Sequence, residues 1–287
     1  MADGPTVRRR RLGAELRALR EKNGFKLEEV ADRLGIASST LSRIETGKAP
    51  TKTAYLTAML ALYEVNDATA QRVLLEMARE GHRKGWWSVY DDVLPSGMSM
   101  YVGLEAEASG LRSYEAMVIH GLLQTPEYAR AVLKEMYSRH TEEQIRRMSD
   151  VRAERQRRLD SAEGDSSFDL WIIHDEGVIR RTVGGPSVMR LQLSHLLADA
   201  ERPNVTMQVL PFESGAHAAS SGSFSVLEFP ERTDADVVSI DSVAGMIFLE
   251  KDRDVRDRTE AFDRLRAAAL SPAASADLVA RVSRELA

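Results

Sequence analysis

Apolar residues recur at helical spacing through the first eighty residues of the chain. Leu12, Leu16 and Leu19 lie on one face of a helix, and the Asn23-Gly24 pair that follows them is typical of a helix end. The same spacing predicts four further helices, over residues 27–34, 38–46, 53–63 and 66–80. Residues 1–80, here called the head, are therefore expected to fold as an all-α domain of five helices.

A tight turn joins the second and third of these helices. Gly35 ends the second helix by accepting a left-handed backbone, and Gly47 with Pro50 ends the third. The third helix carries small polar residues and one arginine, Arg43, on its outer face. Two short helices in this arrangement place side chains in the major groove of DNA, so the pattern predicts a helix-turn-helix.

The head resembles the lambda-repressor-like helix-turn-helix of the xenobiotic-response-element (XRE) type of bacterial regulators. The resemblance rests on LRALR at 16–20, LEEVA at 27–31, LGI at 34–36 and STLSRIETG at 39–47. It implies a DNA-binding regulator. It also implies that Arg20 and Glu45 form a structural ion pair that ties the first helix to the third.

The resemblance further implies which side chains face DNA. By position, Ser38, Ser39, Ser42 and Arg43 are expected to present their side chains to base edges. Arginine reads guanine through a bidentate contact, so Arg43 is the expected main determinant of specificity. The alternative is that Arg43 grips a phosphate, because most protein–DNA hydrogen bonds go to the backbone.

The head departs from the family pattern at three positions. Lys26 and Ala37 stand where helix-capping residues are usual, and Leu27 replaces a common glutamine that anchors phosphate. We therefore expect phosphate anchoring to shift to basic side chains, whose charges add affinity that depends on salt but not on sequence. These are Lys26, Arg17, Lys48 and Lys52.

Residues 81–98 are predicted to be a linker and aromatic anchor. Gly81–Gly85 is typical of a linker, and Trp86-Trp87 begins an aromatic cluster with neither helical nor strand spacing. Large aromatic side chains are costly to leave in water, so the tryptophans are expected to anchor the domains; a ligand platform is the alternative.

Residues 99–287, here called the body, are predicted to form an α+β effector or dimerisation domain. Its part 99–160 is expected to be helical, with helices over 99–115, 127–137 and 141–159. The part 165–287 holds short β-branched and aromatic runs, which are expected to pair in an antiparallel sheet. Strands are predicted at 168–173, 205–210, 224–229, 237–240 and 246–249, and helices at 187–200, 255–269 and 275–286.

Composition fits a soluble protein of the reducing cytoplasm. The chain has no cysteine, no apolar run long enough to span a membrane and no secretory signal. Its net charge is −5, but residues 1–52 hold twelve basic against seven acidic residues. A basic head on an acidic body orients the molecule on a polyanion. The run Arg8–Arg11 belongs to this charge, unless it is only a solvated tail.

The body shows no motif for catalysis. His174-Asp175-Glu176 lacks the spacing of a zinc site, and there is neither a nucleophile elbow nor a phosphate-binding loop. We expect no enzyme, no cofactor and no metal. Arg180 and Arg181 with Gly184 and Gly185 are a candidate anion or ligand site, although a plain tight turn explains them better. The arginines of the helix at 141–159 are expected to form a salt-bridged face, solvated or turned to a dimer partner.

Motifs spread along the body resemble the effector-like domain found behind XRE heads in antitoxin-like regulators of actinomycetes. They include Gly85-Trp86-Trp87, Gly121–Ala129, Asp175–Val178 and Gln208–Pro211. The resemblance implies a transcriptional regulator, often paired with a small acidic partner protein.

The expected function is sequence-specific regulation of transcription by a homodimer on double-stranded DNA. A single head covers one half-site, so a palindromic operator with half-sites about 34 Å apart is expected. The body would sense a partner protein or ligand. The alternative is an antitoxin-like module that binds a small partner protein, with DNA binding for autoregulation.

Overall fold

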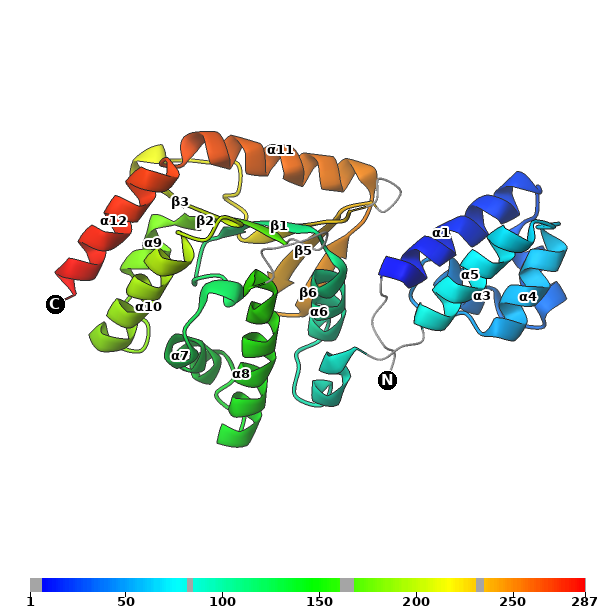
Figure 1. Ribbon diagram of the computed structural model, residues 1–287, viewed down its shortest axis with the longest axis horizontal. Coiled ribbons are helices and arrows are strands. Elements are labelled where there is room, and N and C mark those ends of the chain that lie inside the picture. The colour runs from blue at the N-terminus through cyan, green and yellow to red at the C-terminus, as the bar shows by residue number, and fades with distance from the viewer. Residues whose placement is uncertain (1–6, 82–84, 161–167, 231–234, 287) are drawn as a thin grey trace. The chain divides into compact units, whose positions relative to one another are not determined.

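The computed structural model describes residues 7–81, 85–160, 168–230 and 235–286 (Figure 1). The chain forms two compact units. The first takes the residues up to Asp91 together with Gly97–Glu107, and the second takes Asp92–Ser96 and the chain from Ala108 onward. Residues 82–84 of the expected linker lie outside the described residues. In the described part of the chain, no helix is long and apolar enough to cross a membrane.

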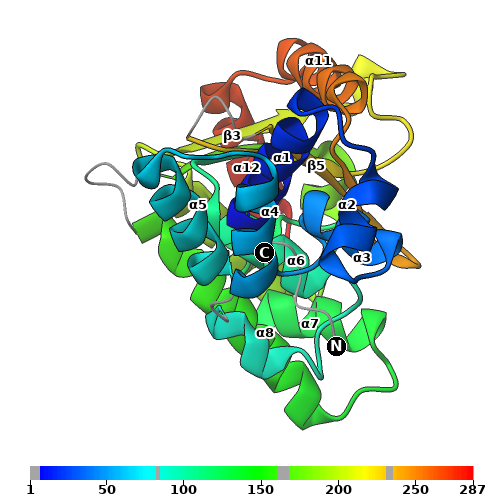
Figure 2. The same ribbon diagram turned by 90° about the vertical axis from the view of Figure 1, so that its right-hand side faces the viewer.

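The first unit is helical, as the spacing of its apolar residues predicts. Figure 2 shows α2 and α3 next to each other in this unit. Buried Leu12, Leu16, Leu41 and Ile44 belong to one apolar cluster shared by its helices. The elements are α1 (Val7–Lys22), α2 (Leu27–Leu34), α3 (Ser38–Glu45), α4 (Thr53–Leu62), α5 (Ala68–Gly81), the 3-10 helix η1 (Trp86–Tyr90) and α6 (Met98–Glu107).

The paired tryptophans lie in η1. The rings of Trp86 and Trp87 meet edge to face, with their centroids 5.8 Å apart. A Cβ atom on Gly103 of α6 would lie 2.9 Å from the Trp87 ring. Glycine at this position therefore lets the indole pack directly on α6, inside the first unit.

The second unit contains one mixed sheet of six strands in the order β3-β2-β1-β4-β5-β6. β1, β2 and β3 are parallel, whereas β4, β5 and β6 pair antiparallel with their neighbours. The expectation of an antiparallel sheet is therefore wrong. The strands are β1 (Gly110–Glu115), β2 (Asp169–Asp175), β3 (Val205–Leu210), β4 (Phe224–Glu228), β5 (Val237–Ser242) and β6 (Gly245–Leu249).

Part of the error lies at β1. The helix predicted over 99–115 ends at Glu107 as α6, and Gly110–Glu115 is a central strand. Parallel strands need long crossover connections, and the helices between β1, β2 and β3 supply them. These are α7 (Pro126–Met136) and α8 (Glu142–Gln156) in the first crossover, and α9 (Glu176–Arg180) and α10 (Pro186–Asp199) in the second.

Helices lie on both sides of this sheet (Figure 1). α11 (Asp252–Ala268) covers one face, while α7, α8 and α10 lie on the other side; α12 (Pro272–Glu285) contacts α10 and β3. An apolar cluster joins α11 to the sheet, and its buried members include Tyr114, Ile173, Val226, Phe262 and Leu265. Strand side chains alternate between faces, so the residues between these point away from α11.

The face away from α11 carries a buried polar row. Ser113, Ser225 and Ser239 are neighbours across β1, β4 and β5, and the hydroxyl oxygens of Ser113 and Ser225 are 2.8 Å apart. Further along β1, Glu115 is the register neighbour of His174 on β2. Burial raises the pKa of Glu115 to about 7, and the nearby Asp241 adds to the rise.

The arginines of α8 divide between two surroundings. Arg146 binds Glu143 and Asp150 on the exposed side of the helix, as a salt-bridged face predicts. Arg155, in contrast, is buried, and Arg152 is half-buried. The prediction of a wholly solvated or partner-facing arginine face is therefore wrong for these two residues.

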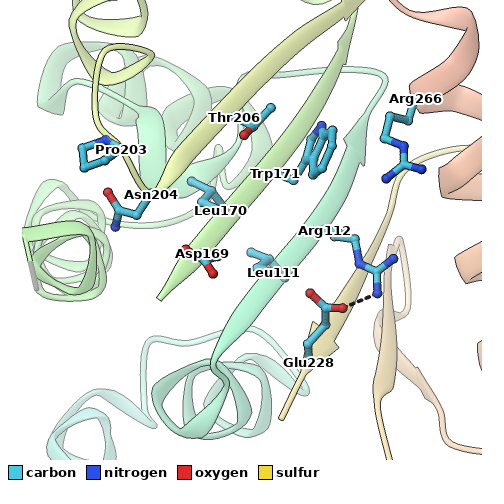
Figure 3. A pocket seen from close by; sticks show the side chains of 10 residues that line it. All are labelled: Leu111, Arg112, Asp169, Leu170, Trp171, Pro203, Asn204, Thr206, Glu228 and Arg266. Atoms are coloured by element: carbon cyan, nitrogen blue, oxygen red, sulfur yellow. Dashed lines mark hydrogen bonds and ion pairs between the residues drawn. The ribbon is translucent and has the colours of Figure 1, made fainter. Parts of the chain in front are cut away.

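On the α11 side, the amino-terminal halves of the parallel strands border a cavity of about 360 Å³ (Figure 3). Arg112 in the lining pairs with Glu228, and Trp171 Nε1 donates to Oε1 of the neighbouring Gln208 at 2.8 Å. Among the described residues, Arg112 Nε and Asn204 Oδ1 have no hydrogen-bond partner. The Arg266 guanidinium stands 5.1 Å from the Trp171 ring centroid, which is a cation–π contact.

The raised pKa of Glu115 predicts how the stability of the protein depends on pH. The unfolded chain releases this proton near the ordinary value of 4.5 and the folded chain near 7, so wild type loses stability as pH rises between the two. Glu115→Gln removes this loss, and its stability relative to wild type should increase by up to about 3 kcal/mol from pH 4 to pH 8. Urea unfolding followed by circular dichroism measures it.

The matched control is Glu135→Gln, which removes an exposed carboxylate on α7. It should shift stability equally at both pH values. A Glu115→Gln difference that is also equal at pH 4 and pH 8 would contradict the assignment.

Candidate nucleic-acid interface

The turn between α2 and α3 is built by Gly35. Its φ of 65° is left-handed, and its N–H bonds the Asp32 carbonyl at 3.1 Å. The next amide, of Ile36, bonds the Ala31 carbonyl at 3.0 Å. These bonds end α2 and turn the chain within three residues into α3, as the position of the glycine predicts.

α3 has one buried and one exposed face. Leu41 and Ile44 are buried in the apolar cluster of the first unit. Ser39, Ser42 and Arg43 are exposed, and because they are three and four positions apart they share one outward face. Ser38, the first residue of the helix, is half-buried. A free surface of short polar side chains and one arginine suits contact with base edges.

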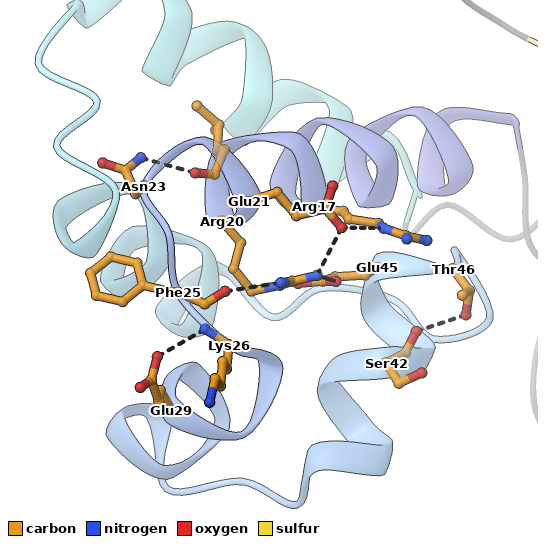
Figure 4. Close-up of polar contacts among 11 residues, drawn as sticks. Arg17, Arg20, Glu21, Asn23, Phe25, Lys26, Glu29, Ser42, Glu45 and Thr46 are labelled. Carbon is orange, nitrogen blue, oxygen red and sulfur yellow. Dashed lines mark hydrogen bonds and ion pairs between the residues drawn. The ribbon is translucent and has the colours of Figure 1, made fainter.

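A buried ion pair fixes α3 to α1 (Figure 4). Arg20 Nε and Nη2 donate to the two carboxylate oxygens of Glu45 at 2.7 and 2.8 Å, and Nη1 donates to the Phe25 carbonyl at 3.0 Å. Arg20 is 8% exposed and Glu45 is 6% exposed. The hydrogen bond to Glu45 raises the pKa of Arg20. One guanidinium thus joins α1, the loop after it and the end of α3, with bidentate geometry.

Two glycines allow the backbones to approach closely around this pair. A Cβ atom on Gly13 of α1 would lie 2.5 Å from the carbonyl oxygen of Ile44, so no larger residue fits there. Gly47, which has a φ of 68°, would bring its Cβ to 2.8 Å from the Arg10 Cα. The end of α3 therefore lies directly against α1.

The two helices that lack the usual capping residue of the family differ in how their first turns are hydrogen-bonded. At α2, Glu29 Oε2 accepts the Lys26 backbone N–H at 2.8 Å, which satisfies part of the helix start (Figure 4). At α3, the N-cap residue Ala37 makes no side-chain cap bond. The first amides of α3 therefore remain for water or for a phosphate oxygen.

The candidate phosphate anchors are all exposed. Lys26 precedes α2, Lys48 follows α3, and Lys52 precedes α4, where its ammonium lies 5.6 Å from the Tyr55 ring centroid. Arg17 differs from them, because its Nε donates to Glu21 at 2.8 Å (Figure 4). The surface pair with Glu21 reduces the charge that Arg17 offers to DNA, whereas the three lysines keep theirs.

The N-terminal basic run is not a solvated tail. Arg8–Arg11 belong to α1, and Arg9 is only 4% exposed, with its Nε donating to the Gly81 carbonyl at 2.6 Å. Sequence patterning offers no signal for this contact, because its partner is the last residue of α5, 72 positions further along the chain.

In the body, the candidate anion site is largely a turn. Gly184 and Gly185 have φ values of 70° and 93° and lead into Pro186, the first residue of α10. Arg180 pairs with Glu176 at 2.7 Å and with Glu285 at 3.2 Å. Of the two arginines, Arg180 therefore has counter-ions within the fold, while Arg181 is exposed.

The side chains of His174, Asp175 and Glu176 each have different surroundings and do not form one site. His174 is fully buried, Asp175 caps α9 through the Gly177 amide at 2.8 Å, and Glu176 also accepts the Phe212 amide at 2.9 Å. Among the described residues, no group of histidines and acids is arranged to hold a metal ion. The fold also brings His217, distant in sequence, to within 3.4 Å of the Tyr114 hydroxyl.

Two family models match the chain. Residues 11–73 match the model described as a helix-turn-helix domain, which confirms that motif. Residues 98–281, more than half of the chain, match the model described as "Domain of unknown function (DUF5753)". No curated protein and no solved structure matches significantly. Neither description names an antitoxin or an actinomycete, so those parts of the resemblance stay predictions.

Removing one partner of the buried pair should destabilise the head strongly. Arg20→Ala leaves the Glu45 carboxylate buried without its counter-ion, which costs about 3–5 kcal/mol. Thermal unfolding of the full chain measures the loss. The control, Arg17→Ala, breaks the exposed pair with Glu21 and should cost no more than about 0.5 kcal/mol. Equal effects of the two substitutions would show that the buried pair does not hold the head together.

Proposed function

The chain belongs to the DUF5753 family, and we propose that it is a sequence-specific DNA-binding transcriptional regulator that acts as a homodimer. The observation that carries the proposal is the outward face of α3. Ser39, Ser42 and Arg43 are exposed on a helix whose other face is buried and whose end is fixed by the Arg20–Glu45 pair. A rigid polar helix of this kind enters the major groove as a recognition helix.

Within this proposal, Arg43 reads guanine. Arg43 has the longest side chain on the outward face of α3, and it is the only cationic residue there. Its guanidinium can donate two hydrogen bonds to O6 and N7 of one guanine. Ser39 and Ser42 read bases less selectively, because a single hydroxyl can both donate and accept.

Affinity comes from the lysines around α3. Lys26, Lys48 and Lys52 flank α2 and α3 in the chain, and their charges release counter-ions from the DNA backbone. The uncapped start of α3 offers further amide donors to a phosphate.

Two copies act together in this proposal. One head contacts a single half-site, so two heads about 34 Å apart on a palindromic operator give the affinity and length of site that regulation requires. The body supplies the dimer contact and senses a ligand or partner protein, and the regulator works in the cytoplasm. In the antitoxin-like alternative, the body binds a small acidic partner protein. Co-purification of such a partner would distinguish this alternative from the homodimeric regulator.

Arg43→Ala should abolish sequence preference. We expect binding to the selected operator to weaken by about 5- to 150-fold for each half-site, because the dimer loses one bidentate guanine contact in each, while binding to unrelated DNA persists and stays sensitive to salt. Mobility-shift competition between operator and random duplex measures both quantities on the full chain.

Lys48→Ala provides the comparison. It removes a candidate phosphate contact from each head, so it should weaken binding to every sequence alike and reduce the salt slope by about 1 for each head bound. If Arg43→Ala retains wild-type specificity and behaves like Lys48→Ala, then Arg43 grips a phosphate and the proposed reading of guanine is incorrect.

A further inference from the structure

The cavity of about 360 Å³ on the α11 side of the sheet takes no part in the proposed contact with DNA (Figure 3). Asp169 and Trp171 are two positions apart on β2, so both side chains point to this face. Arg112 and Thr206 are the register neighbours of Trp171 and point the same way. Arg266 lines the same space from the last turn of α11. A volume of this size suits a small metabolite.

One side of the cavity carries acceptors that the fold does not use. Asn204 lines it and is only 8% exposed, and its Nδ2 donates to the carbonyls of Leu159 at 3.3 Å and Phe168 at 3.0 Å. Because both partners are acceptors, the orientation of the amide is fixed, and Oδ1 has no partner among the described residues. The exposed carboxylate of Asp169 likewise makes no hydrogen bond or ion pair with a described residue. This side therefore offers acceptors and negative charge.

The opposite side of the cavity carries two guanidinium groups, those of Arg112 and Arg266 (Figure 3). Arg112 donates from Nη2 to Glu228, while its Nε and Nη1 make no hydrogen bond to a described residue. Arg266 pairs with Asp263 at 3.4 Å, a long contact between half-exposed side chains, and lies over the Trp171 ring. A guanidinium has five N–H donors, so both groups keep donors for a further acceptor.

The charges of the lining balance in number but are separated in space. Two basic side chains, Arg112 and Arg266, stand with two acidic ones, Asp169 and Glu228. A phosphate ester or a polyamine would leave one sign of charge in excess there, whereas a ligand with one charge of each sign would not. Trp171 adds an aromatic surface between the two sides (Figure 3). The lining therefore favours a zwitterion with an apolar part.

We propose that this cavity binds a free amino acid in its zwitterionic form. The carboxylate of the ligand accepts hydrogen bonds from Arg112 and Arg266. Its ammonium lies on the side of Asn204 and donates to the carboxylate of Asp169. The side chain of the ligand contacts the Trp171 ring. That this ligand is the effector sensed by the body rests on the proposed function; the binding itself does not.

Binding is tested on the full chain without DNA. Thermal unfolding is measured with each of the twenty standard L-amino acids at constant pH and ionic strength. At least one of them should raise Tm saturably, by about 2–5 °C at ten times its Kd. Its N-acetyl derivative, which lacks the ammonium, and its amide, which lacks the carboxylate, should not. If no amino acid raises Tm saturably, or if either derivative is as effective as the free amino acid, the proposal is overturned.

Two variants of exposed residues locate the site without removing a buried side chain. Asp169→Asn removes the partner of the ammonium, and Arg266→Gln removes a partner of the carboxylate. Each should weaken binding about ten-fold or more, the value of one hydrogen bond to a charged group. The matched controls, Asp257→Asn and Arg264→Gln, change exposed residues of α11 outside the lining and should keep wild-type affinity. Wild-type affinity in both Asp169→Asn and Arg266→Gln would contradict the proposal.

Amino-acid binding and DNA binding can fail separately. If the full chain has no sequence preference for DNA but binds the amino acid, the proposed function fails and this inference stands. If it reads DNA but no amino acid stabilises it, the inference fails alone. An effector role further requires that the stabilising amino acid change operator affinity in wild type and leave it unchanged in Asp169→Asn.

Discussion

The recognition surface depends on one buried ion pair, between Arg20 and Glu45. α2 and α3 are each only eight residues long, too short to hold a fixed shape alone in water. Arg20 binds both oxygens of Glu45 and the Phe25 carbonyl, so α1, the following loop and α3 share one anchor. Charge is costly to bury, but hydrogen bonds from all three guanidinium nitrogens offset that cost. Glycine at position 13 lets the helices lie close enough for the pair to form.

The second unit is organised by the alternation of its strands. One face of the sheet buries apolar side chains against α11, and the other carries serines, Glu115 and His174 toward the side of α7 and α8. The same face also buries apolar side chains, so the polar groups lie within an apolar layer; these side chains are Leu111, Ile172, Leu227 and Val237.

The head could be predicted from the sequence because its signals are local. Apolar spacing, Gly35 and Gly47 give the helices and their ends within a few residues of each signal. Arg20 and Glu45 are twenty-five residues apart in the sequence. Their pairing could be expected only from the resemblance to a known family. In the body, the sequence does not predict β1, because Arg112, Ser113 and Glu115 interrupt the run of β-branched and aromatic residues that is typical of a strand. Without β1, only the β2–β3 pair could have been inferred to be parallel, from the helix predicted between its strands.

The surroundings of His174 could not be predicted for a related reason. His174 accepts a hydrogen bond from the amide of His120, fifty-four residues away, and no spacing links the two in the sequence. His174 and its acidic neighbours were visible as a polar run, yet burial decides its chemistry. Only the fold shows that His174 points to the opposite face from Ile173, away from α11.

The most direct measurement of the central claim is dimethyl sulfate footprinting of the full chain on an operator selected from random DNA. Dimethyl sulfate methylates guanine N7 in the major groove, the atom that Arg43 is proposed to contact. The account predicts one protected guanine in each of two half-sites about one helical turn apart, with both protections lost in Arg43→Ala. Guanines that stay protected in Arg43→Ala, or an operator without any protected guanine, would contradict it.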